Sequence, residues 1–531
     1  MVFVKTLNKN VDVIDGQQRL TATSILIAVI GDMLEDAGKH ATADGYYRVI
    51  ATEENNLWNP KITPNTKYQK FYNNLLQLDG TAIKYALGAR SNRAIEKNML
   101  KAYKIFHDKL KEQFVDTAGQ LDTGALQDFY NDFMDPAKFT LLQITVPNNI
   151  AAWQVFINLN KKGQDLQIST LVKAIILSTI PDGTEREIAT GTWADMEQEL
   201  EGIKFDQFLH HYFVADVKSV QEKDLYEVVS TDYKDKLTET RQLLNDISEA
   251  AKDYRACVAP MASDYSDKEI EDNLKALKSP LGLVHAYSIL LAGYTKDFRP
   301  GSTSGVKKFR NLVEWVLKYF IRERTICGEE PAKLEKFAAK ICKMIREGKG
   351  PSDIKNEFIS NQTNDSLFKE SFKEKSKSSI GRDFYILSKI NAWGYNDVRR
   401  DLTDIAYKNK SVEHIMPQTP KPDWIIDLKK DPSLEKASED RVKEQHKSYL
   451  NKWGNLTPMH RENNTALLNK IFHEKNNHPK GYKQSNAKIN NQIEKYAQSD
   501  SSYPEPWWDI RSVINRTEAL ADHAERIFKV T

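Results

Sequence analysis

The chain has 531 residues, 40% of them hydrophobic and 28% charged, enough apolar material for the cores of roughly two to four domains. The formal net charge of +2 by itself indicates no nucleic-acid partner. Three widely spaced cysteines argue against a disulfide framework or a cysteine-ligated zinc, and fit a reducing cytoplasm. The longest apolar run, Leu20–Ile30, is too short to span a bilayer, so we expect a cytoplasmic protein without a signal peptide or membrane anchor.

A polar cluster, Asp15–Arg19, lies where a predicted strand passes into a predicted helix. Val11–Ile14 alternates like a short strand, and apolar residues recur with helical spacing over Leu20–Ala37. Backbone N–H groups at a helix start, with a forked guanidinium beside them, can bind a phosphate. The alternative is a capped turn with a salt bridge, which needs no ligand. The candidate nucleotide-binding residues of this cluster are Asp15, Gly16, Gln17, Gln18 and Arg19.

Further elements follow in the N-terminal third. Lys101–Phe114 has the spacing of a helix, and Thr140–Val146 alternates like a strand that Pro147 ends. Ile150–Leu159 and Leu171–Ser178 are predicted helices. We therefore expect a domain that contains both helices and strands.

Residues 181–393 carry helical apolar spacing almost throughout, with short breaks rich in Gly, Pro and Ser. No residue pattern there points to chemistry, so a helical connector or recognition domain is the plain interpretation. Lys369–Lys377, rich in Lys and Ser, is predicted to be a solvated loop or hinge. The clearest predicted helices are Phe205–Val214, Thr238–Ala256, Asp267–Leu277, Gly305–Arg324 and Pro331–Arg346.

The C-terminal part contains the strongest candidate for a catalytic site. Glu413 and His414 lie side by side in a predicted strand, and Asn455 and Asn464 follow about forty to fifty residues later. The expected elements are the strand Ser411–Pro417, a turn into a second strand at Trp453–Thr457, and the helix Thr465–Glu474, which Asn464 opens.

Hydrolysis of a phosphodiester bond explains this set of side chains. A neutral imidazole such as His414 can take a proton from water near pH 7. A carboxylate and an amide oxygen, here those of Glu413 and Asn464, suit a divalent cation that holds the scissile phosphate and stabilises the leaving oxygen. Adjacent residues of a strand point to opposite faces, so Glu413 and His414 can share one cation site only if the strand is bulged or twisted there.

Each feature also has a structural explanation when taken alone. A Glu-His pair can lie on the surface, and an Asn before a helix is usually only its N-cap. Residues 441–490 contain ten Lys or Arg, three Asp or Glu and four His, which suits a phosphate backbone but also a solvated surface. His446 and His460 in this stretch are expected to be surface or DNA-contacting residues. The combination of the features, rather than any one of them, favours a catalytic site.

The C-terminal strings resemble the HNH-like nuclease domain of the GmrSD-type family of modification-dependent (type IV) restriction endonucleases. The resemblance implies that His414 is the general base, that Glu413 and Asn464 are metal ligands, and that Asn455 braces the metal-binding loop as part of the catalytic set. It also implies that Lys475 contacts phosphate or braces the site. The matching residues are Glu413–Gln418, Trp453–Thr457, Asn464, Asn469, Phe472, Lys475, Tyr482, Ser485, Trp507, Trp508 and Ile514–Arg516.

The N-terminal cluster resembles the DGQQR signature of the same family's ParB/sulfiredoxin-like domain, which is tied to nucleotide binding and hydrolysis. A second string, Phe156–Lys173, is similar to another segment of that domain, and Asn160 and Lys173 are the residues expected to line the nucleotide pocket. A motif that the family carries further upstream has no counterpart in the fourteen residues before Asp15. We therefore expect a truncated domain or a misassigned start, with an uncovered sheet edge.

The sequence thus predicts a mostly helical α+β protein with a truncated ParB-like domain at 1–180, a helical connector at 181–395 and an HNH (ββα-metal) domain at 396–531. The predicted function is DNA cleavage in prokaryotic defence, with Mg²⁺ or Mn²⁺, regulated by an NTP. DNA, modified in some form, and a nucleotide are the expected partners, together with a second copy of the chain as a homodimer. The alternatives are a nucleotide-gated DNA-binding or regulatory protein with decayed catalysis, an NTPase with a structural C-terminal domain, and a helical scaffold.

Overall fold

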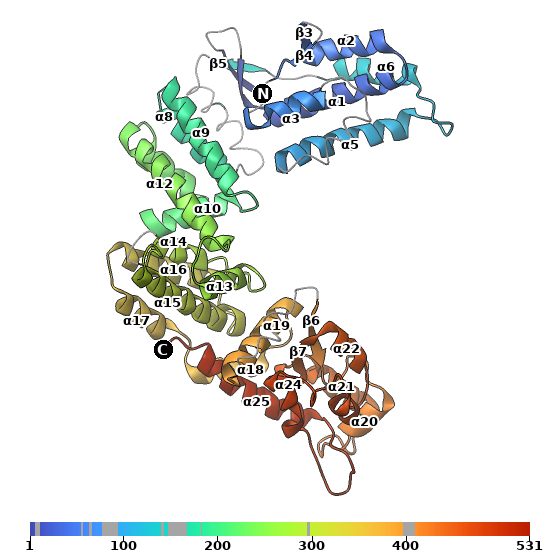
Figure 1. The fold of residues 1–531 in the computed structure, drawn as a ribbon, viewed down its shortest axis with the longest axis vertical. Helices are drawn as coiled ribbons and strands as arrows, with labels where there is room; N and C mark the ends of the chain where they lie inside the picture. The colour runs from blue at the N-terminus through green and yellow to red at the C-terminus, as the bar shows by residue number, and fades with distance from the viewer. Residues whose placement is uncertain are drawn as a thin grey trace. The chain divides into compact units, whose positions relative to one another are not determined.

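A computed structural model describes the chain except for residues 6–10, 55–56, 63–65, 77–93, 140–142, 147–154, 156–166, 182, 295–297 and 397–408 (Figure 1). The described residues are mostly helical with small sheets, which confirms the predicted α+β class. Two compact units divide between residues 166 and 167, so that residues 167–180 pack with the helical region that follows them. None of the described helices combines the length and apolar content needed to cross a membrane.

The first unit contains a three-stranded sheet in the order β2-β1-β5. The central strand β1, Val2–Lys5, pairs antiparallel with β2, Val11–Asp15, and parallel with β5, Ile144–Val146. Strands were predicted at the positions of β2 and β5, but β1 was not. It supplies a partner along one side of β2, which is the last strand at one end of this sheet. A second sheet joins β3, Ala51–Glu54, to β4, Leu57–Pro60.

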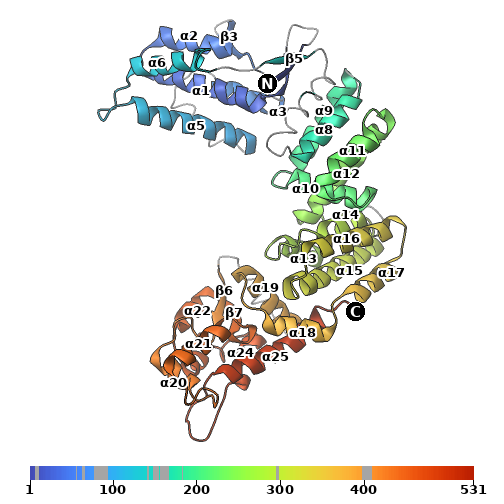
Figure 2. The same cartoon turned by 180° about the vertical axis from the view of Figure 1, so that it is seen from behind.

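Helix α1 is the centre of the first unit's helical layer, with α2 packed on one side and α5 on another (Figure 2). A buried carboxylate, Asp32 of α1, accepts hydrogen bonds from Tyr47 Oη at 2.7 Å and Tyr103 Oη at 2.5 Å. These bonds satisfy a charge that would otherwise be costly inside the core. The helices of this unit are α1 Gln17–Asp36, α2 His40–Ile50, α3 Thr66–Leu76, α5 Ala94–Phe114 and α6 Thr123–Met134. The helices predicted around Leu20–Ala37 and Lys101–Phe114 are thereby confirmed, whereas Ile150–Leu159 lies almost wholly outside the described residues.

The second unit begins with a succession of packed helices that matches the predicted helical region. The helix at Pro331–Arg346 has the predicted bounds, since Pro331 is favourable in the first turn and the apolar residues after it keep helical spacing. Three helices run on into π-helical turns, η2 Phe213–Val217, η4 Ile321–Ile326 and η5 Ile390–Gly394. The α-helices are α8 Ile168–Thr179, α9 Thr184–Glu199, α10 Phe205–Tyr212, α11 Leu225–Tyr233, α12 Leu237–Val258, α13 Lys268–Lys278, α14 Ala286–Tyr294, α15 Thr303–Phe320, α16 Pro331–Arg346, α17 Pro351–Asn361, α18 Asp365–Glu374 and α19 Ile380–Lys389.

The prediction of a solvated loop at Lys369–Lys377 was wrong for most of that segment. Lys369 to Glu374 forms the second half of α18, because Phe368 and Phe372, one helical turn apart, are both buried. Only residues 375–379 remain as the connection between α18 and α19. This short connection is important for the candidate site described below.

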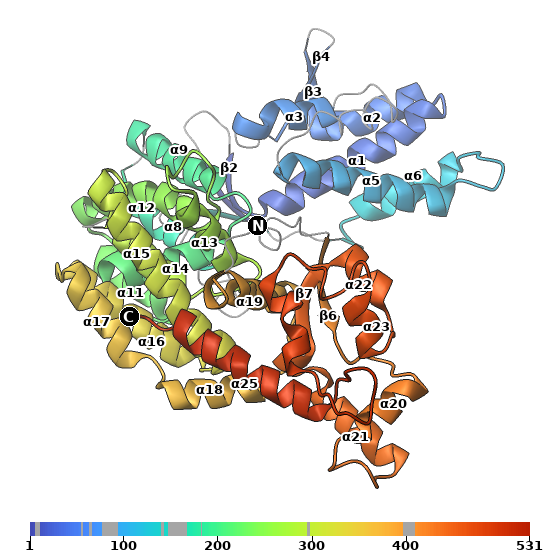
Figure 3. The same cartoon turned by 60° about the horizontal axis from the view of Figure 1, so that its bottom comes forward.

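The C-terminal part contains a β-hairpin with helices on both of its faces (Figure 3). Strand β6, Lys410–His414, pairs antiparallel with β7, Leu456–His460, and contacts α19 and α22. A single helix at Thr465–Glu474 was predicted, but the chain forms two, because Leu468 turns into the left-handed region at φ 44°. The helices here are α20 Pro422–Leu428, α21 Glu439–Leu450, α22 Arg461–Leu467, α23 Phe472–Asn477, α24 Lys488–Asn491 and α25 Ile510–Ile527, with 3₁₀ turns at Trp453–Asn455 and Ile493–Tyr496.

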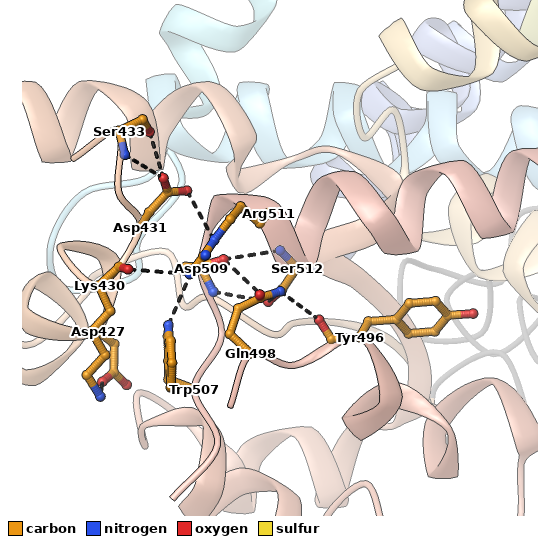
Figure 4. Close-up of polar contacts among 10 residues, drawn as sticks. All are labelled: Asp427, Lys430, Asp431, Ser433, Tyr496, Gln498, Trp507, Asp509, Arg511 and Ser512. Carbon is orange, nitrogen blue, oxygen red and sulfur yellow. Dashed lines mark hydrogen bonds and ion pairs between the residues drawn. The ribbon is translucent and has the colours of Figure 1, made fainter. Parts of the chain in front are cut away.

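A buried polar cluster fixes the start of the last helix, α25 (Figure 4). Asp509 is fully buried and caps the helix by accepting from the Ser512 backbone N–H at 3.2 Å. Its carboxylate also accepts from Trp507 Nε1 at 3.1 Å and Arg511 Nε at 3.0 Å. Arg511 donates in addition to the carbonyl of Lys430 at 3.3 Å, which ties α25 to the chain after α20.

The anchored helix α25 holds the beginning of β7. Arg516, which is fully buried, donates to the carbonyls of Gly454 and Leu456, each at 2.8 Å. The hydroxyl of Thr517 accepts from the Gly454 N–H at 3.0 Å. The approach is close enough that a Cβ on Gly454 would lie 2.0 Å from the carbonyl oxygen of Val513. Glycine is therefore required at this crossing for steric reasons.

Replacing Asp509 with alanine should lower the free energy of unfolding by about 1–3 kcal/mol, since the cap of α25 is lost and buried donors lose their acceptor. Urea unfolding of the full chain, followed by circular dichroism, measures the change. Asp500→Ala, which removes an exposed carboxylate, is the control and should leave the unfolding free energy almost unchanged. Equal losses in the two variants would contradict an anchoring role for Asp509.

Candidate functional site

Strand β6 ends at His414, and the turn that follows is held by side chains from elsewhere in the chain. The hairpin places Glu413 opposite Thr457 and His414 opposite Leu456, without an irregularity in the register. After the last pair, the N–H of Ile415 donates to the carbonyl of Asn455 at 2.9 Å. The chain then leaves the sheet through residues 415–417, which are all buried.

Asn455 is the principal brace of this turn. Its amide oxygen accepts from the Met416 N–H at 2.7 Å, and its amide nitrogen donates to the carbonyls of Met416 at 3.1 Å and Leu450 at 2.8 Å. The side chain is fully buried and is engaged with backbone groups. Asn455 therefore holds the end of β6 in place, as the bracing residue of the predicted catalytic set would.

A histidine contributes a second brace and corrects one expectation. His446 of α21 was predicted to lie on the surface or contact DNA, but it is buried, and its Nε2 lies 3.0 Å from the carbonyl oxygen of Pro417. Proline at this position has no N–H to donate, so its carbonyl is the group that fixes the end of the turn. His460, the last residue of β7, is exposed as expected.

Glu413 lies inside the protein, paired with a buried lysine. Its Oε1 accepts from Lys475 Nζ at 2.7 Å and from Tyr482 Oη at 3.2 Å. Lys475 Nζ also donates to the carbonyls of His414 at 2.9 Å and Ile415 at 3.1 Å. Burial raises the pKa of the Glu413 carboxyl and lowers that of the Lys475 ammonium, and the contact between them opposes both effects. All three ammonium hydrogens of Lys475 have acceptors, so this residue braces the site.

The side chains of β6 divide between the two faces of the hairpin. Asn464 of α22 donates through Nδ2 to the hydroxyl of Ser411, and strand alternation places Glu413 on the same face as Ser411. On the other face, the Lys410 ammonium lies 5.5 Å from the centre of the Phe384 ring of α19. The two predicted metal ligands thus share a face of the hairpin. His414, the last residue of β6, lies on the opposite face. The convergence of Glu413, His414 and Asn464 on one ion therefore stays a prediction.

The imidazole of His414 is buried and held by two amide side chains. Its Nε2 lies 3.0 Å from Asn451 Oδ1, and its Nδ1 lies 3.4 Å from Gln418 Nε2. Because an amide oxygen can only accept, Nε2 carries the hydrogen and Nδ1 carries the lone pair of the neutral ring. Burial, with a contribution from the ammonium of Lys377, lowers the pKa of His414 to about 4. The ring is therefore neutral near pH 7 and able to accept a proton at Nδ1.

The donor atoms near β6 suit a hard divalent cation. Glu413 and Asn464 offer a carboxylate and an amide oxygen, the ligand types that Mg²⁺ and Mn²⁺ bind. The Asn464 nitrogen donates to Ser411, so a cation would be bound by its amide oxygen. Over the residues that the structure describes, no group of three or more His, Cys, Asp or Glu could hold a metal. A site built on Glu413 and Asn464 would contain one such side chain and complete its shell with water and phosphate oxygens.

The N-terminal cluster forms the junction between β2 and α1 that the sequence predicted. Asp15 is the last residue of β2, and Gly16 precedes the first turn of α1 with φ 103°, a backbone conformation that favours glycine. Gln17, Gln18 and Arg19 are exposed, and Gln17 Nε2 donates to the Val13 carbonyl at 2.7 Å.

Of the two remaining candidate nucleotide residues, one belongs to the second unit and the other lies outside the described residues. Lys173 belongs to α8 of the second unit, where its ammonium lies 3.2 Å from a carboxylate oxygen of Glu197. Asn160 lies outside the described residues. The predicted nucleotide pocket therefore stays a prediction.

Comparison with known proteins assigns the chain to a class of enzyme. The sequence profile described as "GmrSD restriction endonuclease, N-terminal domain" matches residues 1–177, and "GmrSD restriction endonucleases, C-terminal domain" matches residues 360–523. Both matches indicate a restriction endonuclease, whose substrate is DNA. The chain belongs to the GmrSD family, and the braced end of β6 lies within its C-terminal domain. No protein of curated function matches the chain.

Residues that sequence reasoning missed are Asn451, Gln418 as a partner of His414, and His446 as a brace. Asn451 lies four residues before Asn455, in a stretch where asparagines are common, and nothing in the pattern marks it. Tyr482 and Lys475 were noticed only through the family resemblance. Their hydrogen bonds to Glu413 span more than sixty residues of sequence, so no local signal could reveal them.

Asn455→Ala should destabilise the protein by about 2–4 kcal/mol, because it leaves the buried N–H of Met416 and two carbonyls without partners. Thermal and urea unfolding of the full chain measure the loss. Asn491→Ala, at an exposed position of α24, is the matched control. If Asn455→Ala unfolds like the wild type, the end of β6 does not depend on this amide.

Proposed function

We propose that the chain is a DNA endonuclease of prokaryotic defence that hydrolyses phosphodiester bonds with a divalent cation, through an HNH-type C-terminal site. The observation that carries this proposal is the fixed orientation of His414. Its Nε2 is hydrogen-bonded to Asn451, so Nδ1, which lies 3.4 Å from Gln418 Nε2, is the ring nitrogen that would accept a proton at the end of β6. The family membership supports the coarser conclusion that the protein is a restriction endonuclease.

His414 would act as the general base. Its Nδ1 takes a proton from a water molecule while the water oxygen forms a bond to phosphorus. The bond between phosphorus and the 3′-oxygen breaks, and that oxygen is protonated by solvent. The low pKa of His414 keeps the ring in its neutral, proton-accepting form throughout the neutral pH range.

Glu413 and Asn464 would hold Mg²⁺ or Mn²⁺. When bound, the cation supplies positive charge to the phosphate oxygens and to the leaving oxygen. Lys475 and Tyr482 keep the Glu413 carboxylate oriented, and Lys475 also fixes the carbonyls of His414 and Ile415. Lys475 is therefore a positioning residue rather than a base, since each of its hydrogens already has an acceptor.

His414→Ala should reduce metal-dependent cleavage of plasmid DNA by at least about 100-fold, because it removes the general base while the fold stays intact. Glu413→Ala and Asn464→Ala should also abolish cleavage, as should chelation of the metal. Asn491→Ala, at an exposed position of α24 in the same domain, is the control and should cut normally. Unimpaired cutting by folded His414→Ala would overturn the assignment.

A regulatory DNA-binding protein without catalysis is the second candidate. It is favoured by one observation: Glu413 already accepts hydrogen bonds from Lys475 and Tyr482, so the carboxylate has a structural role without any metal. Binding of DNA without metal-dependent cutting, on modified and unmodified plasmids alike, would support this alternative.

Regulation by a nucleotide at residues 15–19 is also part of the proposal. The support is the glycine turn at Gly16 with the exposed side chains of Gln17, Gln18 and Arg19 on the first turn of the 20-residue helix α1. Backbone N–H groups at such a helix start favour a phosphate, and a guanidinium can grip it.

Arg19→Ala should weaken nucleotide binding by roughly tenfold or more, the usual effect of losing a hydrogen bond from a charged group. Titration with a fluorescent nucleotide measures this. Arg48→Ala removes an exposed guanidinium of α2 that pairs with Glu53, and it serves as the control. Identical affinities of the Arg19→Ala variant and the wild type would exclude this cluster as the phosphate site.

A further inference from the structure

The connection between α18 and α19, residues 375–379, runs beside the chain that leads into β7. The Lys377 N–H donates to the carbonyl of Asn451 at 2.9 Å, and Ser376 and Lys452 form an antiparallel bridge. The Lys452 ammonium donates to the carbonyl of Glu374 at 2.8 Å. These contacts fix the backbone of Lys377 against Asn451, two residues before the 3₁₀ turn at Trp453–Asn455.

Asn451, the partner of Lys377, is the residue that orients the proposed general base. Its backbone carbonyl accepts from Lys377, and its side-chain oxygen lies 3.0 Å from His414 Nε2. A single residue, Asn451, therefore links the backbone of Lys377 to the imidazole of His414.

The ammonium of Lys377 differs from that of Lys475 in its surroundings. Lys475 is buried, and its ammonium donates hydrogen bonds to Glu413 and to two backbone carbonyls. Lys377 is half-buried, and no carboxylate of the described part of the chain lies within 4.0 Å of its ammonium. Asp383, an acid in its vicinity, is buried and accepts hydrogen bonds from the Ser378 N–H and hydroxyl.

We propose that Lys377 binds a phosphate group of the DNA strand that lies at His414, so that the helical region contributes a substrate contact to the nuclease site. A backbone hydrogen bond holds Lys377 against Asn451, and an ammonium on a flexible stem that starts there suits a phosphodiester oxygen. The inference rests on the proposed function, in that DNA is the ligand and His414 marks the site. It adds a substrate residue that lies about thirty residues before β6.

The test compares full-length Lys377→Met and Lys377→Arg with the wild type. Binding of a short fluorescein-labelled duplex is followed by anisotropy without added metal, at several salt concentrations. Lys377→Met should bind roughly tenfold more weakly, and the slope of log affinity against log salt should fall by about one. Lys377→Arg keeps the charge and should restore most of the affinity. Lys349→Met, in the turn between α16 and α17, removes an exposed lysine elsewhere in the same unit and should change neither quantity.

Cleavage assays separate this inference from the proposed function. If the protein cuts DNA, Lys377→Met should raise KM more than it lowers kcat, whereas His414→Ala should lower kcat. Failure of the wild type to cut would overturn the proposed nuclease and leave the Lys377 contact to be judged by binding alone. Unchanged affinity and salt slope in folded Lys377→Met, or an equal loss in Lys349→Met, would overturn the inference.

Discussion

The buried turn after β6 is held by hydrogen bonds from three distant side chains, and the candidate site depends on them. Asn455 bonds the backbone of Met416, His446 bonds Pro417, and Lys475 bonds the carbonyls of His414 and Ile415. Buried backbone groups without partners are costly, so these contacts leave the turn little freedom to rearrange. The same contacts fix the positions of Glu413 and His414 at the end of β6.

The helical region is part of the architecture of the site and not merely a connector before it. Helix α19 covers the face of the hairpin on which His414 lies, and α22 and α23 cover the face of Glu413. Helix α25 holds the start of β7 through the hydrogen bonds that Arg516 donates. Both the helical region and the hairpin belong to the unit of residues 167–531, and residues 375–379 link α18 and α19 to the imidazole of His414 through Asn451.

Features with a local cause were predictable from the sequence. The first strand of the hairpin was predicted because Pro417 stops it, and the second because it follows a turn. Helix α16 was predicted because apolar residues with helical spacing follow Pro331. The left-handed residue Leu468, which splits one predicted helix into two, carries no such signal. The roles of His446 and Asn451 escaped prediction because their partners lie about thirty or more residues away. Strand β1 escaped because four residues are too short to show a pattern.

We propose that Glu413 and Asn464, which share one face of the braced hairpin, hold the catalytic cation. A crystal grown with Mn²⁺ tests it most directly, because the anomalous signal of the metal locates it independently of any assay. We expect one strong peak within bonding distance of a Glu413 carboxylate oxygen and the Asn464 amide oxygen. A fully occupied Mn²⁺ site elsewhere, with the Glu413–Lys475 pair unchanged and no peak at the hairpin, would contradict the account.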